Sequence, residues 1–257
     1  MSLKYNYRSL HLDCARHFFS VETVKKVIEG ISYGNLNVLH WHLTDDHAWR
    51  IESKKFPKLH ESSGQYYTQE QIREIIDYAK KRGIDVIPEI DMPAHATSFT
   101  KVWPELAVQN QVSPLNGNRP LVDHIDVSKA EGVQLIKDLF DDYTTGANPT
   151  FDSETIVHIG ADEFVYNYTA YRQFVNTIVP HVKETNTVRM WGGLTWINDG
   201  KTEIVADIPL SELFGYNTNL RSMTGGRGTY AYTFSRYEQA PSDVQAKVIA
   251  DNEKEEQ

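Results

Sequence analysis

The sequence predicts an α/β fold in which parallel strands form a (β/α) barrel of the TIM type. Short apolar, β-branched runs alternate with amphipathic helical stretches over most of the chain. Acidic and histidine residues follow several of these runs directly. In such a barrel the carboxyl ends of the strands form the catalytic face, so the residues that follow the strands are the first candidates for function.

Short runs of apolar and β-branched residues are expected to form the strands. In chain order they are Leu10–Leu12, Val38–Leu43, Asp85–Ile90, Thr155–Ile159 and Val188–Trp191. The helices between them show apolar residues at three- and four-residue spacing, with expected starts at Ser20, Thr68, Ser128 and Tyr168. Thr68 and Gln71 make a capping box, and Gly83 ends that second helix. The last of these helices runs to about Glu184.

The barrel is expected to be incomplete. A closed barrel needs eight strand–helix units, and only about five fit before Leu194. The residues that follow are too few for three more units of about 30 residues each. They also show another pattern, with strand-like runs at Lys201–Leu210 and Thr229–Arg236, a glycine-rich turn, and a helix that opens at Pro241.

Composition excludes several classes of function. The formal net charge of −9 disfavours a nucleic acid or an anionic membrane as partner. Cys14 is the single cysteine, so neither an intramolecular disulfide nor a cysteine-rich metal site can form. No run is long enough for a membrane helix, and the N-terminal residues lack a signal-peptide pattern. The default expectation is the cytoplasm, and an extracellular location stays open if a leader has been removed.

Asp162 and Glu163 follow a predicted strand and are the most informative pair of residues. Two carboxylates held close together cannot both ionise easily, so one pKa rises and that group can act as a general acid. Most acidic pairs are solvated surface. This one gains weight because three other strand ends also carry charged or imidazole groups.

His40 and His42 share one face of the second predicted strand, and three interpretations are open. They fill the barrel interior with satisfied hydrogen bonds, they bind zinc as a His-x-His pair, or they form a polar relay that holds a catalytic group. Arg16, after the first strand, can donate a forked pair of hydrogen bonds to vicinal hydroxyls. Trp191, with Trp196 and Tyr166, either lines a pocket or belongs to the core.

Four segments at these strand ends closely resemble the motifs of family 20 glycoside hydrolases, the β-N-acetylhexosaminidases. The segments are Leu12–Phe18, His42–Arg50, Pro88–His95 and His158–Glu163. They occur in the family's order, and the resemblance spans roughly residues 4 to 200. Ala94 and Ala161 stand where many members have glycine, and these are small changes.

The resemblance implies removal of terminal N-acetylhexosamine residues by a substrate-assisted retaining mechanism. The 2-acetamido oxygen of the substrate attacks the anomeric carbon and gives an oxazolinium intermediate. Glu163 protonates the leaving oxygen and later activates water. Asp162 holds the acetamido N–H and stabilises the positive charge that develops there.

The resemblance also implies the roles of the surrounding residues. Arg16 binds hydroxyls of the terminal sugar, and Trp191 forms one wall of the acetamido pocket. Asp45, His95 and His158 form a supporting polar relay that tunes the protonation of Glu163. No metal and no cofactor is needed, which makes zinc the weakest interpretation of His40 and His42.

The C-terminal part resembles another family, the end of translation elongation factor G. The resemblance rests on segments 204–216, 220–228 and 237–241, and it implies a small α+β, ferredoxin-like segment. The chain contains no phosphate-binding Gly-x-x-x-x-Gly-Lys-Ser/Thr loop, so no GTP chemistry is expected. We therefore expect a composite chain, with the catalytic barrel over 1–204 and the elongation-factor-like segment over 205–257.

The two-part organisation of the chain has a consequence for activity. By the resemblance, the last three barrel strands bring further tryptophans, a tyrosine and acidic residues to the sugar, and no segment here matches them. We expect severely reduced activity, and association through exposed barrel edges. The alternative is a non-catalytic carbohydrate-binding or remnant protein, and net charge disfavours a ribosome-associated module. The preference between glucosamine and galactosamine linkages stays undecided.

Overall fold

The computed structural model describes residues 5–113 and 119–192. These residues all lie in the first of two units into which the chain divides, Met1–Thr202. The predictions for Trp196, for the strands at Lys201–Leu210 and Thr229–Arg236, and for the ferredoxin-like segment fall outside the described residues.

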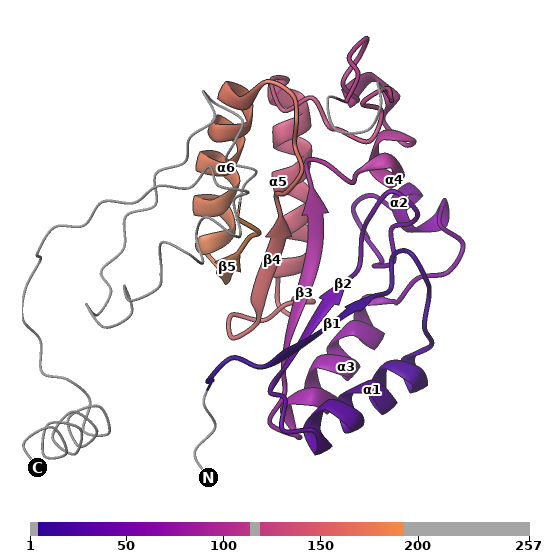
Figure 1. Ribbon diagram of the computed structural model, residues 1–257, viewed down its shortest axis with the longest axis vertical. Helices are drawn as coiled ribbons and strands as arrows, with labels where there is room; N and C mark the ends of the chain where they lie inside the picture. The colour runs from indigo at the N-terminus through magenta and orange to yellow at the C-terminus, as the bar shows by residue number, and fades with distance from the viewer. Residues whose placement is uncertain (1–4, 114–118, 193–257) are drawn as a thin grey trace, which may run out of the picture. The chain divides into compact units, whose positions relative to one another are not determined.

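Five parallel strands form one sheet in chain order, so each strand pairs with its neighbours in the sequence (Figure 1). They are β1 (Ser9–Asp13), β2 (Val38–His42), β3 (Asp85–Met92), β4 (Ile156–Gly160) and β5 (Thr187–Arg189). Parallel neighbours in sequential order are what a (β/α) barrel requires, which confirms the predicted fold class. In the part of the chain that the structure describes, the barrel is incomplete, with β1 and β5 at its edges.

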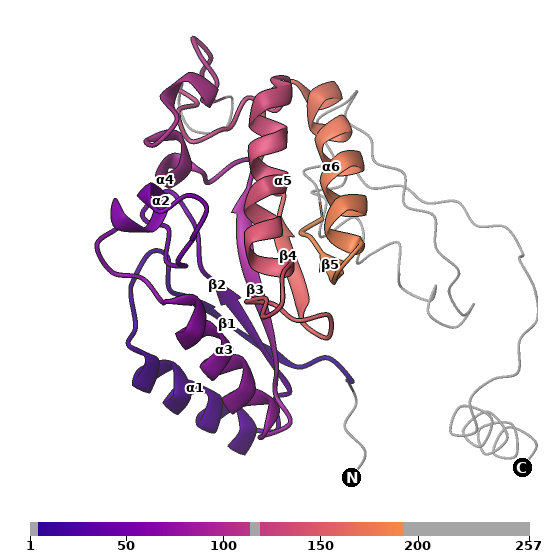
Figure 2. The ribbon, with the colours of Figure 1, turned by 180° about the vertical axis from the view of Figure 1, so that it is seen from behind.

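Four long helices cover one face of this sheet (Figures 1 and 2). They are α1 (Val21–Tyr33), α3 (Gln69–Lys80), α5 (Ala130–Thr144) and α6 (Tyr168–Lys183). Three shorter helices lie in the connections, namely α2 (Lys58–Glu61), α4 (Thr97–Thr100) and η1 (Pro104–Leu106). One long helix therefore follows each of the first four strands, as the alternation in the sequence predicts.

The helix starts show how far local sequence determines structure. Ser20 accepts the amide of Thr23, and Thr68 makes the predicted capping box with Gln71. The predicted start at Ser128 is wrong, because α5 begins at Ala130. The Ser128 hydroxyl instead lies 2.5 Å from Asp126 Oδ1, in a local turn that competes with a helix cap.

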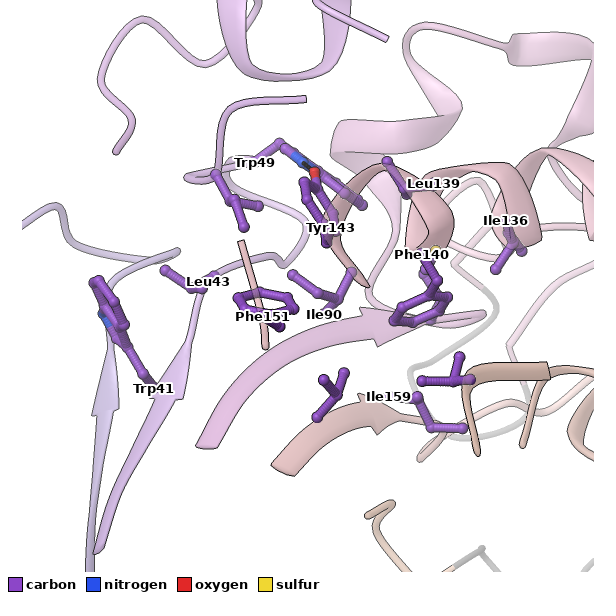
Figure 3. Close-up of a cluster of buried hydrophobic side chains, with 14 of the residues drawn as sticks. Trp41, Leu43, Trp49, Ile90, Ile136, Leu139, Phe140, Tyr143, Phe151 and Ile159 are labelled. Carbon is purple, nitrogen blue, oxygen red and sulfur yellow. Dashed lines mark hydrogen bonds between the residues drawn. The ribbon is translucent and has the colours of Figure 1, made fainter. Parts of the chain in front are cut away.

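Alternation along the strands divides the sheet into an apolar and a polar face. Trp41, Leu43, Ile90 and Ile159 belong to the buried core, which contains residues of α5 (Figure 3). Their neighbours in sequence, such as His40 and Glu89, point to the opposite face, because successive strand residues alternate. All five residues of β2 are buried, as expected for a strand covered on both sides.

The apolar core contains internal polar contacts, among them one between Trp49 and Tyr143. Trp49 Nε1 donates to the hydroxyl of Tyr143 at 3.2 Å, and both side chains are fully buried (Figure 3). The bond links the connection after β2 to helix α5 and satisfies both groups.

The sequence predicts that the chain has no membrane-spanning helix. Among the described residues, no helix combines the length and the apolar character that crossing a bilayer requires.

Candidate active site

A polar cavity of about 170 Å³ lies among the segments that follow β1 to β4. Its lining residues come from four connections of the sheet and are mostly charged or polar: Arg16, Asp45, Asp46, His47, Ala94, His95, Ser113, Arg119, Asp123, His124, Glu163 and Val165. Because the carboxyl ends of parallel strands meet at one edge, residues far apart in sequence converge here. Arg16, Asp45, His95 and Glu163 were predicted from the sequence and line this cavity together.

Glu163 presents its carboxylate at the cavity with about half of the side chain exposed. Glu163 Oε2 lies 3.2 Å from His95 Nε2, and the other ring nitrogen of His95 lies 3.9 Å from Asp46 Oδ2. Asp46 is itself held by Thr97, which donates to Asp46 Oδ1 from its amide at 3.0 Å and from its hydroxyl at 2.6 Å. The result is a row of Glu163, His95 and Asp46.

The relay therefore differs from the expected one. On the side of His95 that faces away from Glu163, the carboxylate within 4.0 Å is that of Asp46. The sequence predicted Asp45 in this place. Asp45 Oδ2 instead binds Arg16 at 2.7 Å and His42 Nε2 at 3.0 Å. Asp45 still lies near His95, because the three groups have atoms within 4.8 Å of one another.

The contacts of Asp45 fix its charge and the position of Arg16. Burial alone would raise the pKa of Asp45, but the hydrogen bond from His42 and the charge of Arg16 lower it. The Arg16 guanidinium, half exposed, also binds Asp13 Oδ2 at 2.9 Å. Two carboxylates thus hold the cation that was predicted to contact sugar hydroxyls.

Asp162 lies beside the buried carboxyl group of Asp91. One oxygen of each lies within 4.8 Å of the other and of a His95 nitrogen. Oδ1 of both residues is buried without a hydrogen-bond partner among the described residues. Burial raises the pKa of Asp162, and burial together with the Asp162 carboxylate raises the pKa of Asp91 well above its usual range.

The sequence predicted that repulsion between Asp162 and Glu163 raises the pKa of the general acid, but the raised pKa is that of Asp162, and its main cause is another. Burial contributes most to the shift, whereas the Glu163 carboxylate is a minor contributor. Asp162 and Asp91 together make a site that favours a proton or a hydrogen-bond donor from a bound molecule.

Gly160 allows this close approach of β3 and β4. Its φ is +66°, and a Cβ placed on it would lie 1.8 Å from Asp91 Oδ1 and 2.7 Å from Asp91 Cα. The second distance involves backbone, so a rotamer change cannot relieve it. Glycine is therefore required at this position for both conformation and space.

Gly160→Ala is expected to lower the free energy of unfolding by about 3 kcal/mol, because overpacking adds to the left-handed backbone cost. Gly83→Ala is the matched control, since Gly83 has φ +70° with nothing within 4 Å of its Cβ position. It should cost only about 1 kcal/mol. Urea denaturation of both variants measures the difference, and equal losses would contradict a clash at Asp91.

On the polar face of the sheet, Glu89 is fully buried and its carboxylate is surrounded by ring nitrogens. Glu89 Oε2 lies 2.6 Å from His42 Nδ1, 3.0 Å from His40 Nε2 and 3.5 Å from His11 Nε2. Glu89 Oε1 lies 3.2 Å from His158 Nδ1 and accepts the Trp191 indole N–H at 2.6 Å. We call these six residues the Glu89 cluster.

The protonation of the Glu89 cluster follows from these contacts. Burial would raise the pKa of Glu89, but the hydrogen bonds from His11, His158, His40 and His42 hold it well below its usual range. Burial would lower the pKa of His42, but its bonds to Asp45 and Glu89 raise it to about 10. His42 is thus an imidazolium between two carboxylates.

These contacts favour two of the three interpretations of His40 and His42. Both oxygens of Glu89 accept N–H groups, so the imidazoles fill the barrel interior with satisfied bonds, and His42 connects Asp45 to Glu89. A zinc ion binds the lone pair of a ring nitrogen. The ring nitrogens that donate to Glu89 carry protons instead, so these lone pairs are not free for a metal. The donor arrangement does not favour it.

His158 and Trp191 both lie in the Glu89 cluster, and neither is among the residues that line the cavity. His158 was expected to support Glu163, and it contacts Glu89 instead. The Trp191 ring stacks on His40 with centroids 5.0 Å apart, and its role as a wall of an acetamido pocket stays a prediction.

Several residues of the site were not singled out from the sequence. Asp46, Asp91 and Glu89 lie inside the recognised segments, so the motifs alone could have suggested them. Asp123 and His124 lie in the long connection between β3 and α5, where no periodic pattern or motif marks them. They are brought to the cavity only by the fold of that connection.

Comparison with known proteins gives two family matches. The family model described as "Glycosyl hydrolase family 20, catalytic domain" matches residues 5–206. The model described as "Elongation factor G C-terminus" matches residues 192–248, which confirms the second resemblance seen in the sequence.

Similar proteins and structures are β-hexosaminidases. The chain is 36% identical to a β-hexosaminidase of Vibrio furnissii over 62% of this chain and 29% of the relative. It is 39% identical to one of Porphyromonas gingivalis over 62% of this chain and 21% of the relative. The chain therefore spans less than a third of the length of either relative.

Two solved structures share the fold. One is an exo-β-N-acetylglucosaminidase from Vibrio harveyi, 30% identical with a TM-score of 0.57, covering 71% of this chain and 34% of that one. The other is a chitobiase from Flavobacterium johnsoniae, 32% identical with a TM-score of 0.62, covering 73% of this chain and 32% of that one. Together with the match over residues 5–206, these likenesses show that the chain belongs to glycosyl hydrolase family 20.

Proposed function

We propose that this site removes terminal N-acetylhexosamine residues from glycans by a substrate-assisted retaining mechanism. The observation that carries the proposal is the half-exposed Glu163 carboxylate, 3.2 Å from His95 at the cavity, with the half-buried Asp162 next to it in the chain. A half-exposed acid beside a less exposed carboxyl group provides the two different roles that this chemistry needs.

In the proposed reaction the substrate supplies its own nucleophile. The 2-acetamido oxygen attacks the anomeric carbon while Glu163 donates a proton to the leaving oxygen, so the glycosidic bond breaks and an oxazolinium forms. Glu163, now a carboxylate, then removes a proton from the water that opens this intermediate. His95 lies within hydrogen-bond distance of Glu163 and can hold it in place in both steps.

Asp162 is proposed to accept the acetamido N–H. Its buried, unpartnered Oδ1 is suited to this, because a hydrogen bond from the substrate would satisfy it as positive charge develops on the acetamido group. Arg16 is proposed to bind hydroxyls of the terminal sugar, since two carboxylates hold its half-exposed guanidinium at the cavity. Trp191 is proposed as one wall of the acetamido pocket.

The substrate class is proposed from the relatives. The Vibrio harveyi relative has been solved in complex with N-acetylglucosamine. By analogy, the partners of this chain are glycans that end in N-acetylglucosamine or N-acetylgalactosamine.

The mechanism is tested with three nitrophenyl glycosides that differ only at C2. The 2-acetamido substrate is expected to react, and the 2-hydroxyl substrate should react at least about a hundredfold more slowly, because it lacks the internal nucleophile. The 2-trifluoroacetamido substrate should be intermediate, since fluorine weakens the acetamido oxygen as a nucleophile. Equal rates for the acetamido and hydroxyl substrates would rule out substrate assistance.

We also propose that residues 205–257 form a separate elongation-factor-like segment that takes no part in this reaction. The two family matches overlap only over residues 192–206, which supports a join in this part of the chain. Limited proteolysis followed by mass spectrometry is expected to give a first cut near this join. Uniform resistance of the whole chain would contradict a two-part organisation.

A further inference from the structure

The segment Asp123–Ile125 is bonded to the turn that carries His95. The amide of Ala96 donates to the carbonyl of Asp123 at 2.9 Å, and the amide of Ile125 donates to the carbonyl of Pro93 at 2.8 Å. These two backbone bonds lie on either side of His95 in sequence. The segment therefore holds the His95 turn at both of its ends.

The side chain of His124 reaches the loop that carries Glu163. His124 Nε2 accepts the amide of Val165 at 3.3 Å, and the imidazole ring lies 5.3 Å from the ring of Phe164. His124 is only 4% exposed, so water cannot easily replace this bond. Because Nε2 accepts, the ring proton sits on Nδ1, which donates to Asp123 Oδ1 at 2.9 Å.

The loop that carries Glu163 needs such support, because its backbone is unfavourable. Ala161, Glu163 and Asn167 have φ values of +72°, +46° and +44°. Each lies in the left-handed region, which costs a residue with a side chain roughly 1–2 kcal/mol. Tyr171 holds one end of the loop by donating its hydroxyl to the carbonyl of Ala161 at 2.5 Å.

We propose that His124 is a positioning residue for the general acid. It connects the two segments whose side chains meet in the contact between His95 and Glu163, and so fixes the direction in which Glu163 presents its carboxyl group. The inference rests on the proposed role of Glu163 as acid/base. In this role His124, which also lines the cavity, acts through the backbone of Val165 and the turn of His95.

This role has a chemical signature that a purely structural role lacks. A displaced general acid slows cleavage only where the leaving oxygen needs a proton. Phenoxide is a poor leaving group that needs one, whereas dinitrophenoxide leaves without help. Loss of positioning should therefore appear in kcat/KM for the phenyl glycoside and be nearly absent for the dinitrophenyl glycoside.

The experiment compares three variants of the full chain. His124→Phe keeps a planar aromatic ring and removes the acceptor for Val165. His124→Gln keeps an acceptor at about the position of Nε2. His60→Phe is the matched control, because His60 is equally buried and its Nδ1 accepts the amide of Ser53 at 3.1 Å, without lining the cavity.

We expect His124→Phe to lower kcat/KM for the phenyl N-acetylglucosaminide at least about tenfold, and for the dinitrophenyl glycoside less than about threefold. Amide hydrogen exchange at Val165 should also become at least about tenfold faster. His124→Gln should restore both, and His60→Phe should change neither the leaving-group dependence nor the Val165 exchange.

Equal losses on the two substrates, or Val165 exchange no faster than in His60→Phe, would overturn the proposal. If His124→Phe does not fold, His124→Gln decides through the same two readouts, since normal values in both are expected. If the wild-type chain shows no hydrolysis that depends on Glu163, the proposed function fails, while Val165 exchange still tests the link through His124.

Discussion

Glu163→Gln is expected to lower kcat/KM for a phenyl N-acetylglucosaminide by about 10²–10⁴-fold, the usual contribution of a general acid. The carboxamide has nearly the same shape as the carboxyl group, but it cannot donate a proton to the leaving oxygen or accept one from water. The Glu163 side chain is about half exposed and, among the described residues, pairs with His95, so the substitution should leave the fold intact.

The measurement is steady-state hydrolysis of the phenyl and dinitrophenyl glycosides, together with a thermal melt. Glu131→Gln, an exposed residue in the first turn of α5, is the matched control and should leave both unchanged. The loss should be far smaller for the dinitrophenyl glycoside. Wild-type rates in Glu163→Gln on both substrates would show that another group is the acid.

Glu89→Leu is expected to lower the free energy of unfolding by about 3–5 kcal/mol, the cost of removing one partner from a buried ion pair. Leucine fills most of the volume but accepts no hydrogen bond. His42 would lose one of its two carboxylates, and the Trp191 indole N–H would lose its acceptor. Urea denaturation with a two-state fit measures the change.

Glu154→Gln is the control for Glu89→Leu, because Glu154 pairs with Lys80 on the surface. An exposed ion pair is screened by water and salt, so this variant should unfold at nearly the wild-type urea concentration. A similarly small effect of Glu89→Leu would mean that the Glu89 cluster is not an ionic network in the folded protein.

The same network predicts how stability depends on pH. The pKa of His42 is raised from 6.5 to about 10 on folding, so its contribution is fully present below about pH 6.5 and is lost as pH rises toward 10. The pKa of Glu89 is lowered, so its contribution is present above its ordinary value and is lost in acid. Denaturation between pH 5 and 10 should show a decline above about 6.5 that is shallower in Glu89→Leu.

Local patterns were enough to predict most of the fold. The strands are short apolar runs, and the caps at Ser20 and Thr68 depend only on residues three positions away. Ser128 failed as a cap because a side chain two residues earlier offered a competing hydrogen bond. The order of the strands followed from the alternation with helices, since a crossover helix joins parallel neighbours.

The site was predicted only as far as its motifs reach. Which of the neighbours Asp45 and Asp46 faces His95 depends on the backbone direction after β2, and sequence spacing does not determine that. Gly160 admits Asp91 because of a close approach between two strands, which is a tertiary property. His124 reaches Val165 through a connection without any periodic pattern.

The Glu89 cluster constrains how this sequence can change during evolution. Each ring nitrogen around the Glu89 carboxylate contacts an oxygen that at least one other member of the Glu89 cluster also contacts. A single replacement of Glu89 or His42 leaves a buried charge without its partner, so its effect depends on which residues occupy the other positions. Substitutions here should show strong epistasis, with viable changes arriving in compensating pairs.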